Sequence, residues 1–380
     1  MRASVWLAFT PQDTLFIRDG RAFDAGVENA AQAVWPTPST IAGAVTAAFG
    51  GREPCEVRGP VLARCDSTGE RWTPFFRTPA DLVRREETSE EVLRLSPAPA
   101  PVGVTTDLGT VPQWLDGAGL AGMGPQWGGW LSGSTMTRYL AGNVAVEPVH
   151  PKDASGGSLV HLEADPVDVE PHVGLARGAE RTARTGFLYQ AAHLRLRQRW
   201  GFLAECVVCD GWDAQRRESV PFGGRGRLAW VEQVSGVNWP QAPSASVDGD
   251  AYPDGRVAVY VATPALWPEG WMPPLRTWAP GSELVAAAVG DAQPVATATP
   301  GERGARPMNR MLRWAVPAGS VYFLKFADSD HATTWAQGKQ AQAERQERCG
   351  TGVHGTAFGR DPKDRLRTAG FGVVLTGVWK

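Results

Sequence analysis

Two arginines near the start of the chain have the type and spacing to bind phosphate. Arg18 and Arg21 flank Gly20, which permits the positive φ of a tight turn, so two fork-shaped guanidinium groups are expected near one loop tip. A helix start follows, with Thr37 as the expected N-cap and Pro38 at the first helical position. The free N–H groups of a helix N-terminus also suit an anion. The predicted phosphate-binding surface is completed by Ser39, Thr40 and Gly43.

Two regular elements must position this surface. Apolar residues alternate with others over residues 4–9, which is the period of a strand with one buried face, and Pro11 ends it. Over residues 41–49 apolar residues recur at the spacing of one helical face, and Gly50-Gly51 ends the helix. We therefore expect the helix to pack on the strand.

A second group of arginines is predicted to lie on a long strand. From His193 to residue 208 the even positions are almost all apolar, whereas Arg195, Arg197 and Arg199 share the opposite face as a basic ladder. A Gly-rich segment upstream carries three more arginines, Arg177, Arg181 and Arg184. The pairing of the two segments predicts a projecting hairpin, or thumb, over about residues 170–200. The alternative is a solvated face whose arginines form salt bridges to Glu170, Glu180 and Glu205.

Two glycine-rich turns enter strands in the same way. Residues 222–227 lead into a strand over 228–234, and residues 365–372 lead into a strand over 373–379, which suggests a duplicated fold. Backbone N–H groups of such turns can approach phosphates closely, the alternative being plain turns. The candidate residues are Gly223, Gly224, Arg225, Arg227, Arg367, Gly370 and Gly372. For the second turn we expect ligand approach rather than positive φ to explain the glycines, because arginines precede them.

The order of several short motifs carries a family resemblance. The motifs are Pro-x-Pro-Ser-x-x-x-Gly at 36–43, His172-Val173-Gly174-Leu175, Thr185-Gly186-Phe187-Leu188-Tyr189, Phe222-Gly223-Gly224, Pro317-Ala318-Gly319-Ser320-Val321-Tyr322, Gly370-Phe371-Gly372 and Gly377-Val378-Trp379. In this order the chain resembles the third-subunit family of the CRISPR type III-B (Cmr) effector complex, a Cas5-like group of the repeat-associated RNA-binding (RAMP) superfamily. The resemblance implies an α+β fold of two ferredoxin-like (RRM-like) βαββαβ domains with Gly-rich loops and long insertions.

The expected domain boundaries follow from composition and motif positions. An N-terminal domain over 1–237 would contain an irregular insertion at about 82–142, read mostly as loop, and the hairpin at about 170–200. A linker rich in Pro, Ser, Ala and Asp is expected over 238–256, and a C-terminal domain over 257–380. In that domain we expect strands at 257–261, 317–326 and 373–379 and a helix at 331–348.

The resemblance implies a non-catalytic, RNA-binding structural subunit without a cofactor or metal. It would hold the 5′ handle of the guide RNA (crRNA), contact the large polymerase-like subunit and the backbone RAMP subunit, and meet target RNA indirectly. Phosphate clamps and close backbone approach suit such a role. The predicted RNA-binding residues are Arg18, Arg21, Thr37, Ser39, Thr40, Gly43, His172, Arg177, Arg181, Arg184, Arg195, Gly223, Gly224, Arg225, Arg227, Arg367, Gly370 and Gly372.

Composition limits the other classes of function. The 380 residues carry a formal net charge of −2, so RNA contact must use a local basic surface rather than bulk positive charge. No apolar run approaches the ~20 residues of a membrane span, and five cysteines, an odd number, fit a reducing compartment better than a disulfide framework. We therefore expect a cytoplasmic protein. No glycine pattern matches an ATP site, and Cys206 and Cys209 would point to opposite faces of a strand, which disfavours zinc.

Two enzyme alternatives remain open. A metal-independent RNA endonuclease of the RAMP type, which would process CRISPR RNA, would use His172, His193 or Tyr189 as general acid or base. A more remote alternative is a carbohydrate-active enzyme, prompted by sixteen Trp residues and by Asp328 and Asp330.

Overall fold

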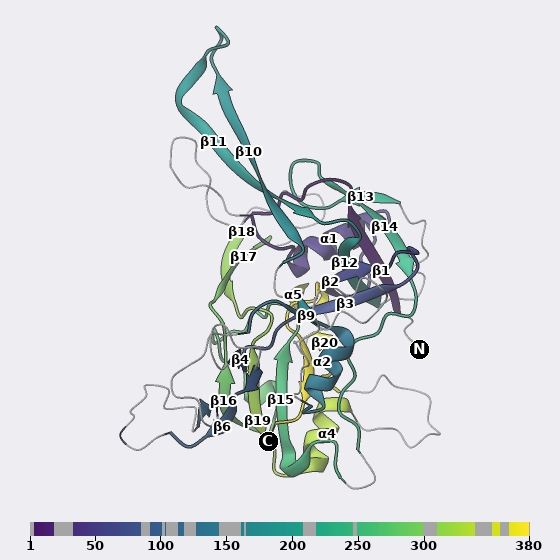
Figure 1. The fold of residues 1–380 in the computed structure, drawn as a ribbon, viewed down its shortest axis with the longest axis vertical. Helices are drawn as coiled ribbons and strands as arrows, with labels where there is room; N and C mark the ends of the chain where they lie inside the picture. Colours follow the sequence, from purple (N-terminus) through teal and green to yellow (C-terminus); the bar gives the residue numbers. More distant parts are fainter. Residues whose placement is uncertain are drawn as a thin grey trace.

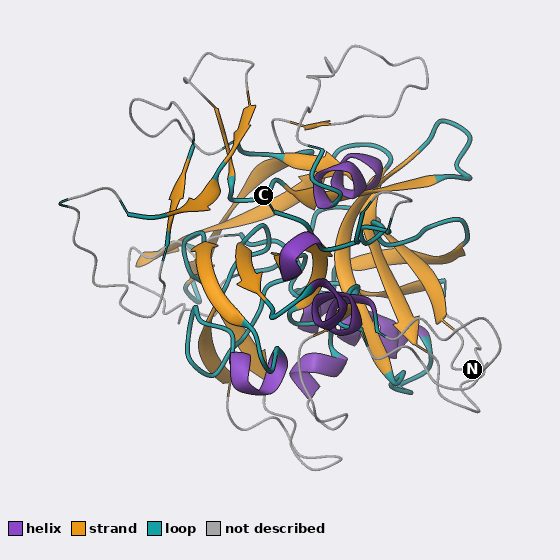
Figure 2. Ribbon diagram, turned by 90° about the horizontal axis from the view of Figure 1, so that it is seen from below, coloured by secondary structure: helices purple, strands orange, loops and turns teal. Residues whose placement is uncertain are grey.

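A computed structural model describes the following residues of the chain: 4–18, 33–84, 92–100, 103, 113–117, 127–143, 161–162, 165–207, 218–245, 249–298, 310–338, 352–357 and 365–379. Strands dominate these residues and the helices are short (Figure 2). The fold is a mixed α/β arrangement whose sheets are antiparallel throughout the described part. No helix in the described ranges is long and apolar enough to cross a membrane.

The N-terminal half is built on an eight-stranded sheet, in the upper part of Figure 1. Its strands, in spatial order, are β13 (Ser219–Pro221), β14 (Leu228–Val234), β1 (Ser4–Pro11), β12 (Trp200–Val207), β2 (Glu56–Cys65), β3 (Trp72–Arg77), β8 (Trp130–Ser132) and β9 (His161–Leu162). The strand expected over 4–9 is confirmed as β1, an interior strand of this sheet between β14 and β12.

Helix α1 (Pro38–Ala48) begins where the sequence predicts. Thr37 is its N-cap in extended conformation, and the proline occupies the first turn, where its missing N–H costs nothing. One face, with Ile41 and Val45 at its centre, is buried and joins the core that the sheet forms with Leu7 and Phe9. The packing of helix on strand is therefore confirmed.

The C-terminal half repeats the strand order of the first. Its five-stranded sheet, in the lower part of Figure 1, has the order β16 (Glu283–Ala288), β19 (Val321–Lys325), β15 (Arg256–Val261), β21 (Val373–Gly377) and β20 (Thr356–Ala357). Its other elements are η1 (Pro253–Gly255), α3 (Leu275–Trp278), α4 (Ser329–Gln337) and α5 (Arg365–Thr368). In each half the last long strand lies beside the first, β14 beside β1 and β21 beside β15.

This shared order agrees with a duplicated plan. The elements β15, α3, β16, β19, α4 and β21 occur in the order strand, helix, strand, strand, helix, strand, with the β17–β18 hairpin inserted after β16 and with β20 and α5 inserted after α4. In the first half, residues 208–217 between β12 and β13 lie outside the described part of the chain, so a second helix there is neither seen nor excluded. Two complete ferredoxin-like domains therefore stay a prediction.

The two halves share a core rather than standing apart. One cluster of buried residues joins Val61 and Leu203 of the first sheet to Phe323 and Leu375 of the second. The Tyr260 hydroxyl donates a hydrogen bond of 2.7 Å to the carbonyl oxygen of Arg77. The halves are thus held together by apolar packing and hydrogen bonds.

The described residues of the expected linker also pack on the body. The Trp239 ring lies 5.5 Å from the Trp6 ring and 6.0 Å from the Phe76 ring, and its indole N–H donates to Glu205 at 2.8 Å. The backbone carbonyls of Pro240 and Pro243 accept hydrogen bonds from side chains of the second half. The described residues of this segment therefore contact both halves of the protein.

The expected hairpin is present, but the long strand after it is two strands. β10 (Val167–Arg177) and β11 (Ala183–Leu196) form a two-stranded sheet that projects from the body in Figure 1. Residues 197–199 then turn, with Arg199 at a φ of 68°, and β12 enters the eight-stranded sheet. The predicted basic ladder is wrong, because Arg197 and Arg199 lie in this turn and only Arg195 lies on the strand.

The segment 82–142, expected to be mostly loop, contributes to the core where it is described. It forms β4 (Leu82–Arg84) paired with β5 (Val92–Arg94), β6 (Ser96–Ala98) paired with β7 (Trp114–Asp116), then β8 and α2 (Gly133–Leu140). Two of its residues bind the buried Asp81, which precedes the segment: Arg94 pairs with Asp81 at 2.7 Å, and the Tyr139 hydroxyl donates to it at 2.7 Å. A last hairpin, β17 (Gln293–Ala298) and β18 (Arg310–Ala315), lies in the second half.

Candidate nucleic-acid interface

Three segments distant in sequence meet where the hairpin joins the body. The chain just after β1 bonds to β11 through both backbone groups of Leu15 and Leu194, at 2.7 and 2.9 Å. The turn before β14 bonds to the same segment, because the Gly224 N–H donates to the Phe16 carbonyl at 2.8 Å. We call the residues gathered there the hairpin base: Asp13, Thr14, Phe16, Glu170, His172, His193, Arg195, Gly223, Gly224, Arg225 and Arg227.

Arginines and carboxylates alternate across the hairpin base. Asp13 accepts from Arg195 at 3.0 Å and from Arg227 at 2.6 Å, and Arg195 also pairs with Glu170 at 2.5 Å. The hydrogen bond from Arg195 is the main cause that lowers the pKa of Glu170, so this carboxylate stays charged near neutral pH. The side chains of Arg195 and Asp13 are about half exposed, at 46% and 52%. The salt bridge from Arg195 to Glu170, which the alternative of a solvated face predicts, is therefore present, and solvent reaches it.

Two histidines stack beneath these ion pairs. The rings of His172 and His193 lie 4.0 Å apart with an angle of 20° between their planes. His172 Nε2 lies 2.7 Å from Glu170, and His193 Nδ1 lies 2.9 Å from the Thr14 hydroxyl. His193 is only 2% exposed, and its Nε2 has no hydrogen-bond partner in the described part of the chain.

The surroundings of His193 lower the pKa of its ring. Burial is the largest cause that lowers its pKa, followed by the charges of His172, Arg227 and Arg225, while Glu170 acts in the opposite direction. An imidazole is uncharged above its pKa. Burial and the neighbouring charges thus favour the neutral form of His193.

An aromatic side chain supports the glycine turn. The Arg225 guanidinium carbon lies 4.9 Å from the centre of the Phe16 ring, and this ring lies 4.8 Å from that of His193. A Cβ at Gly223 would lie 3.0 Å from the Phe16 carbonyl oxygen, and φ there is +98°. At Gly224 a Cβ would lie 3.2 Å from the Phe16 ring. Atoms of Phe16 thus lie close to both glycines. This packing explains why neither position carries a Cβ, without a bound ligand.

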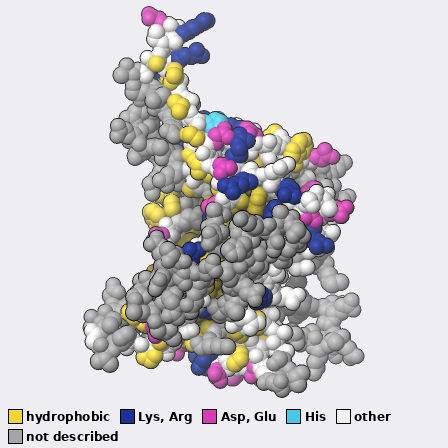
Figure 3. All heavy atoms as spheres, viewed as in Figure 1, with side chains coloured by type: hydrophobic (Ala, Val, Ile, Leu, Met, Phe, Trp, Pro, Cys, Tyr) yellow, Lys and Arg dark blue, Asp and Glu magenta, His cyan; other side chains and the backbone are white. Residues whose placement is uncertain are grey.

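The predicted arginines of the hairpin do not form one site. Arg177, Arg181 and Arg184 are exposed at the tip, with Arg181 at a φ of 62°. The tip is roughly 23 Å from the hairpin base, at about 3.3 Å per residue over the seven residues from Glu170 to Arg177. Figure 3 shows cations at the tip, apolar side chains along the shaft, and mixed charges with a histidine at the base.

The predicted surface at the first helix is only partly described. Arg18 is exposed, and its backbone forms an isolated antiparallel β-bridge with Ala33, shortly before α1. Arg21 lies outside the described residues. The backbone N–H of Thr40 donates to the Thr37 carbonyl at 2.9 Å, and the two hydroxyls lie 3.2 Å apart. Ser39 is half-buried and Gly43 is exposed on the helix with open space around it.

The interpretation of the C-terminal glycines is wrong. Gly370 has a φ of +95°, and a Cβ there would lie 2.6 Å from the carbonyl oxygen of Val57 in the other half. Gly372 also has a positive φ, of 71°. Arg367 lies 3.7 Å from Glu56. These residues meet β2 at the contact between the halves, so backbone conformation and packing explain the glycines there.

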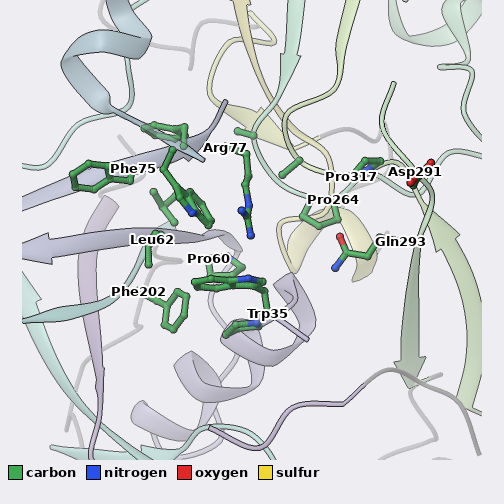
Figure 4. Close-up of a pocket in the computed structure, with 16 residues that line it drawn as sticks. Trp35, Pro60, Leu62, Phe75, Arg77, Phe202, Pro264, Asp291, Gln293 and Pro317 are labelled. Atoms are coloured by element: carbon green, nitrogen blue, oxygen red, sulfur yellow. The ribbon is translucent and has the colours of Figure 1, made fainter. Parts of the chain in front are cut away.

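One feature that sequence reasoning missed is an aromatic cavity of about 420 Å³ between the halves (Figure 4). Its walls include Trp35, Arg77 and Trp130 from the first half and Gln293 from the second. These residues come from a loop, two strands and a hairpin that are far apart in sequence. The only feature of the sequence that indicates this cavity is the abundance of Trp, which the sequence analysis instead took as a sign of a carbohydrate-active enzyme. Asp328, proposed for that enzyme, instead caps α4 by accepting the His331 N–H at 2.8 Å.

The described cysteines differ in their chemical state. Cys65 and Cys206 are free and buried, and burial raises the pKa of the Cys206 thiol. Cys55, however, is disulfide-bonded. Free and bonded cysteines thus both occur among the described residues.

Comparison with known proteins identifies the family. The family model described as "CRISPR-associated protein (Cas_Cmr3)" matches residues 7–379. The chain therefore belongs to this family, as a RAMP-type subunit of a type III CRISPR effector, and the resemblance stated from the motifs is confirmed. No curated protein matches the chain.

Solved structures show a loose likeness over most of the chain. One chain of the cryo-EM structure of the Type III-B Cmr-beta bound to cognate target RNA and AMPPnP is 14% identical, with a TM-score of 0.45 and coverage of 84% of this chain and 86% of that chain. One chain of the cryo-EM structure of the Type III-B Cmr-beta bound to cognate target RNA is also 14% identical, with a TM-score of 0.44 and coverage of 84% of this chain and 86% of that chain. A chain of the crystal structure of the Csm3-Csm4 subcomplex in the type III-A CRISPR-Cas interference complex is 10% identical, with a TM-score of 0.37. The match covers 86% of this chain and 94% of that chain.

Proposed function

We propose that this protein is a non-catalytic, RNA-binding structural subunit of a type III-B CRISPR effector complex. It holds the 5′ handle of the guide RNA at the hairpin base and contacts the large polymerase-like subunit and the backbone RAMP subunit. Target RNA is met indirectly, through the guide. Membership of the Cas_Cmr3 family supports a place in a type III effector complex. The arginines of the hairpin base support RNA binding at that position.

The observation that carries this proposal is the convergence of Arg195, Arg225 and Arg227 from two distant segments. Residues 167–200 carry six arginines and three carboxylates in a chain whose net charge is −2, so positive charge is concentrated at the hairpin. Exposed ion pairs contribute only about 0–1 kcal/mol each. Exchange of the partner Asp13 or Glu170 for a phosphate therefore costs little, and guanidinium groups match phosphate oxygens in bidentate geometry.

The hairpin base also offers contacts for the rest of a nucleotide. Arg225 over the Phe16 ring presents a flat cationic surface on which an unstacked base can lie. The exposed Arg177, Arg181 and Arg184 at the tip lie far enough away to contact a different part of the strand or a neighbouring subunit. A long strand of RNA passing the hairpin would thus meet two separated groups of cations.

The test is to purify the complex from cells that express the full chain with its guide RNA, then sequence the bound RNA and identify the copurifying proteins. Recovery of guide RNA with other effector subunits is expected. A double variant, Arg195→Gln with Arg225→Gln, should retain less RNA, whereas Arg276→Gln, an exposed arginine on α3, should retain as much as the parent. A parent chain recovered without RNA or partners would contradict the proposal.

A second candidate function has one observation in its favour. The stacked His172 and His193 could act as an acid–base pair of a RAMP-type RNA endonuclease. Against it, one ring nitrogen of His193 contacts Thr14 and the other is buried. Cleavage of RNA by the purified chain without metal, abolished by His172→Ala, would favour the endonuclease over the structural subunit.

A further inference from the structure

The cavity between the halves has flat apolar walls. The Trp35 ring lies edge-on to Trp130 at 5.3 Å and to Phe202 at 5.9 Å. The Arg77 guanidinium carbon lies over the Trp130 ring, 3.8 Å from its centre, and 5.4 Å from the centre of the Trp35 ring. Such a set of rings and a stacked guanidinium is what a planar ligand needs.

Polar groups of the cavity point inward from two sides. Arg77 Nη1 donates to Asp165 at 2.8 Å, and the Trp130 indole N–H donates to the same carboxylate oxygen at 2.7 Å, so the guanidinium is held in place. In Figure 4 the Gln293 amide and the Arg77 guanidinium face the middle of the cavity from opposite walls. Within the described part of the chain, the Gln293 side chain makes no hydrogen bond.

The charges in the walls disfavour a phosphate. Arg77 pairs with Asp165, which also accepts the Trp130 indole N–H, so a phosphate that replaced this carboxylate would have to satisfy both donors. Asp291 adds a carboxylate at the second wall. An aromatic side chain of a partner protein would fill the apolar part but leave the Gln293 amide without a hydrogen bond, which is unfavourable once water is excluded. A neutral planar group with donors and acceptors on its edge fits both kinds of wall.

We propose that this cavity binds one unstacked nucleobase of the guide RNA. The inference rests on the proposed function and adds a second site to it, separate from the hairpin base. The base stacks against the Trp35 and Trp130 side of the cavity, and its edge meets the Gln293 amide. The wall formed by Trp35 and Pro36 continues directly into the start of α1, so the strand outside the cavity passes beside that helix.

The volume agrees with this occupant. A cavity of about 420 Å³ lies within the 300–1,000 Å³ range typical of small-molecule sites, and a single base with part of its ribose occupies less than this. Stacking tolerates any base because every base has a flat face, whereas the amide of Gln293 distinguishes bases by their edges. The site should therefore prefer some bases without excluding the others.

The experiment uses the full chain and guide RNAs that carry 2-aminopurine at one position at a time, because its fluorescence falls when it stacks on an aromatic ring. In the parent, one position is expected to be quenched on binding. Trp35→Leu should abolish the quenching at that position and weaken binding roughly 5- to 100-fold, since stacking on an aromatic side chain contributes about that factor per base. Trp314→Ala, an exposed Trp on β18, is the matched control and should change neither.

Gln293→Ala, at a half-buried position on β17, provides a second variant that leaves the aromatic packing intact. It should keep the quenching but reduce the preference among bases at the quenched position. Parent RNA binding without quenching at any position, or quenching that survives Trp35→Leu in a folded variant, would overturn the cavity site while the proposed function stands. Loss of a partner subunit from Trp35→Leu with unchanged RNA affinity would assign the cavity to a protein side chain. A parent that binds no guide RNA would overturn both proposals.

Discussion

Arginine–carboxylate pairs occur in two regions of this molecule, and burial separates their roles. Arg94 and Asp81 lie 2.7 Å apart with side chains 8% and 0% exposed, and the Tyr139 hydroxyl also donates to Asp81. At the hairpin base Arg195 and Asp13 lie 3.0 Å apart but are about half exposed. The first pair cannot exchange its partner without leaving a buried charge, whereas the second can exchange a carboxylate for a phosphate. The same chemistry therefore serves the fold in one region and a ligand in the other.

The largest expected effect tests the buried pair. Arg94→Met should lower the free energy of unfolding by about 3–5 kcal/mol, because Asp81 would remain buried without its cation. Denaturant unfolding measures it. Arg197→Met, which breaks an exposed pair with Asp168, is the control and should change stability by less than about 1 kcal/mol. Similar losses in the two variants would remove the distinction by burial.

The glycine turns extend the comparison from charge to backbone. Gly370→Ala should destabilise the fold by at least about 1–2 kcal/mol, because it forces a side chain into the left-handed region and against Val57. Gly224→Ala, at the hairpin base, needs shifts of a few tenths of an ångström by the Phe16 ring and the Phe16 carbonyl oxygen, at a φ that is not left-handed, and should cost less than Gly370→Ala, about 1 kcal/mol. Melting temperatures of both variants give the result. A fully stable Gly370→Ala that binds RNA poorly would restore the interpretation that RNA approaches this glycine.

Local signals in the sequence predicted much of the fold. The strand β1 follows from apolar residues at every second position, and the helix α1 from apolar residues at helical spacing after the Thr37-Pro38 start. Both signals involve residues close to one another in the chain. The break between β11 and β12 was missed because Arg199 adopts a positive φ that glycine or asparagine usually signals. Contacts such as Asp13 with Arg227, or Trp35 with Trp130, join residues whose proximity depends on the whole fold. Hence residue types of the candidate interface were predictable, but their partners and the cavity were not.

A smaller effect at the hairpin base depends on pH. The pKa of His193 is lowered in the fold, so the unfolded chain binds a proton that the folded one does not as the pH falls below the ordinary value of about 6.5. The parent should lose stability relative to His193→Gln between pH 7.5 and pH 5.5. Unfolding free energies at the two pH values measure this. His354, whose pKa is lowered mainly by burial, is present in both proteins and cancels in the difference. An unchanged difference would mean that His193 is not held neutral.

The salt dependence of guide RNA affinity tests the central claim most directly. For single strands, the slope of log affinity against log salt changes by about 0.7 for each phosphate contact. If the hairpin base binds the RNA backbone, the Arg195→Gln, Arg225→Gln double variant should show a slope shallower by about 0.7 per lost contact, and Arg276→Gln should keep the parental slope. A double variant with the parental slope and affinity would contradict the account and remove the hairpin base from the RNA surface.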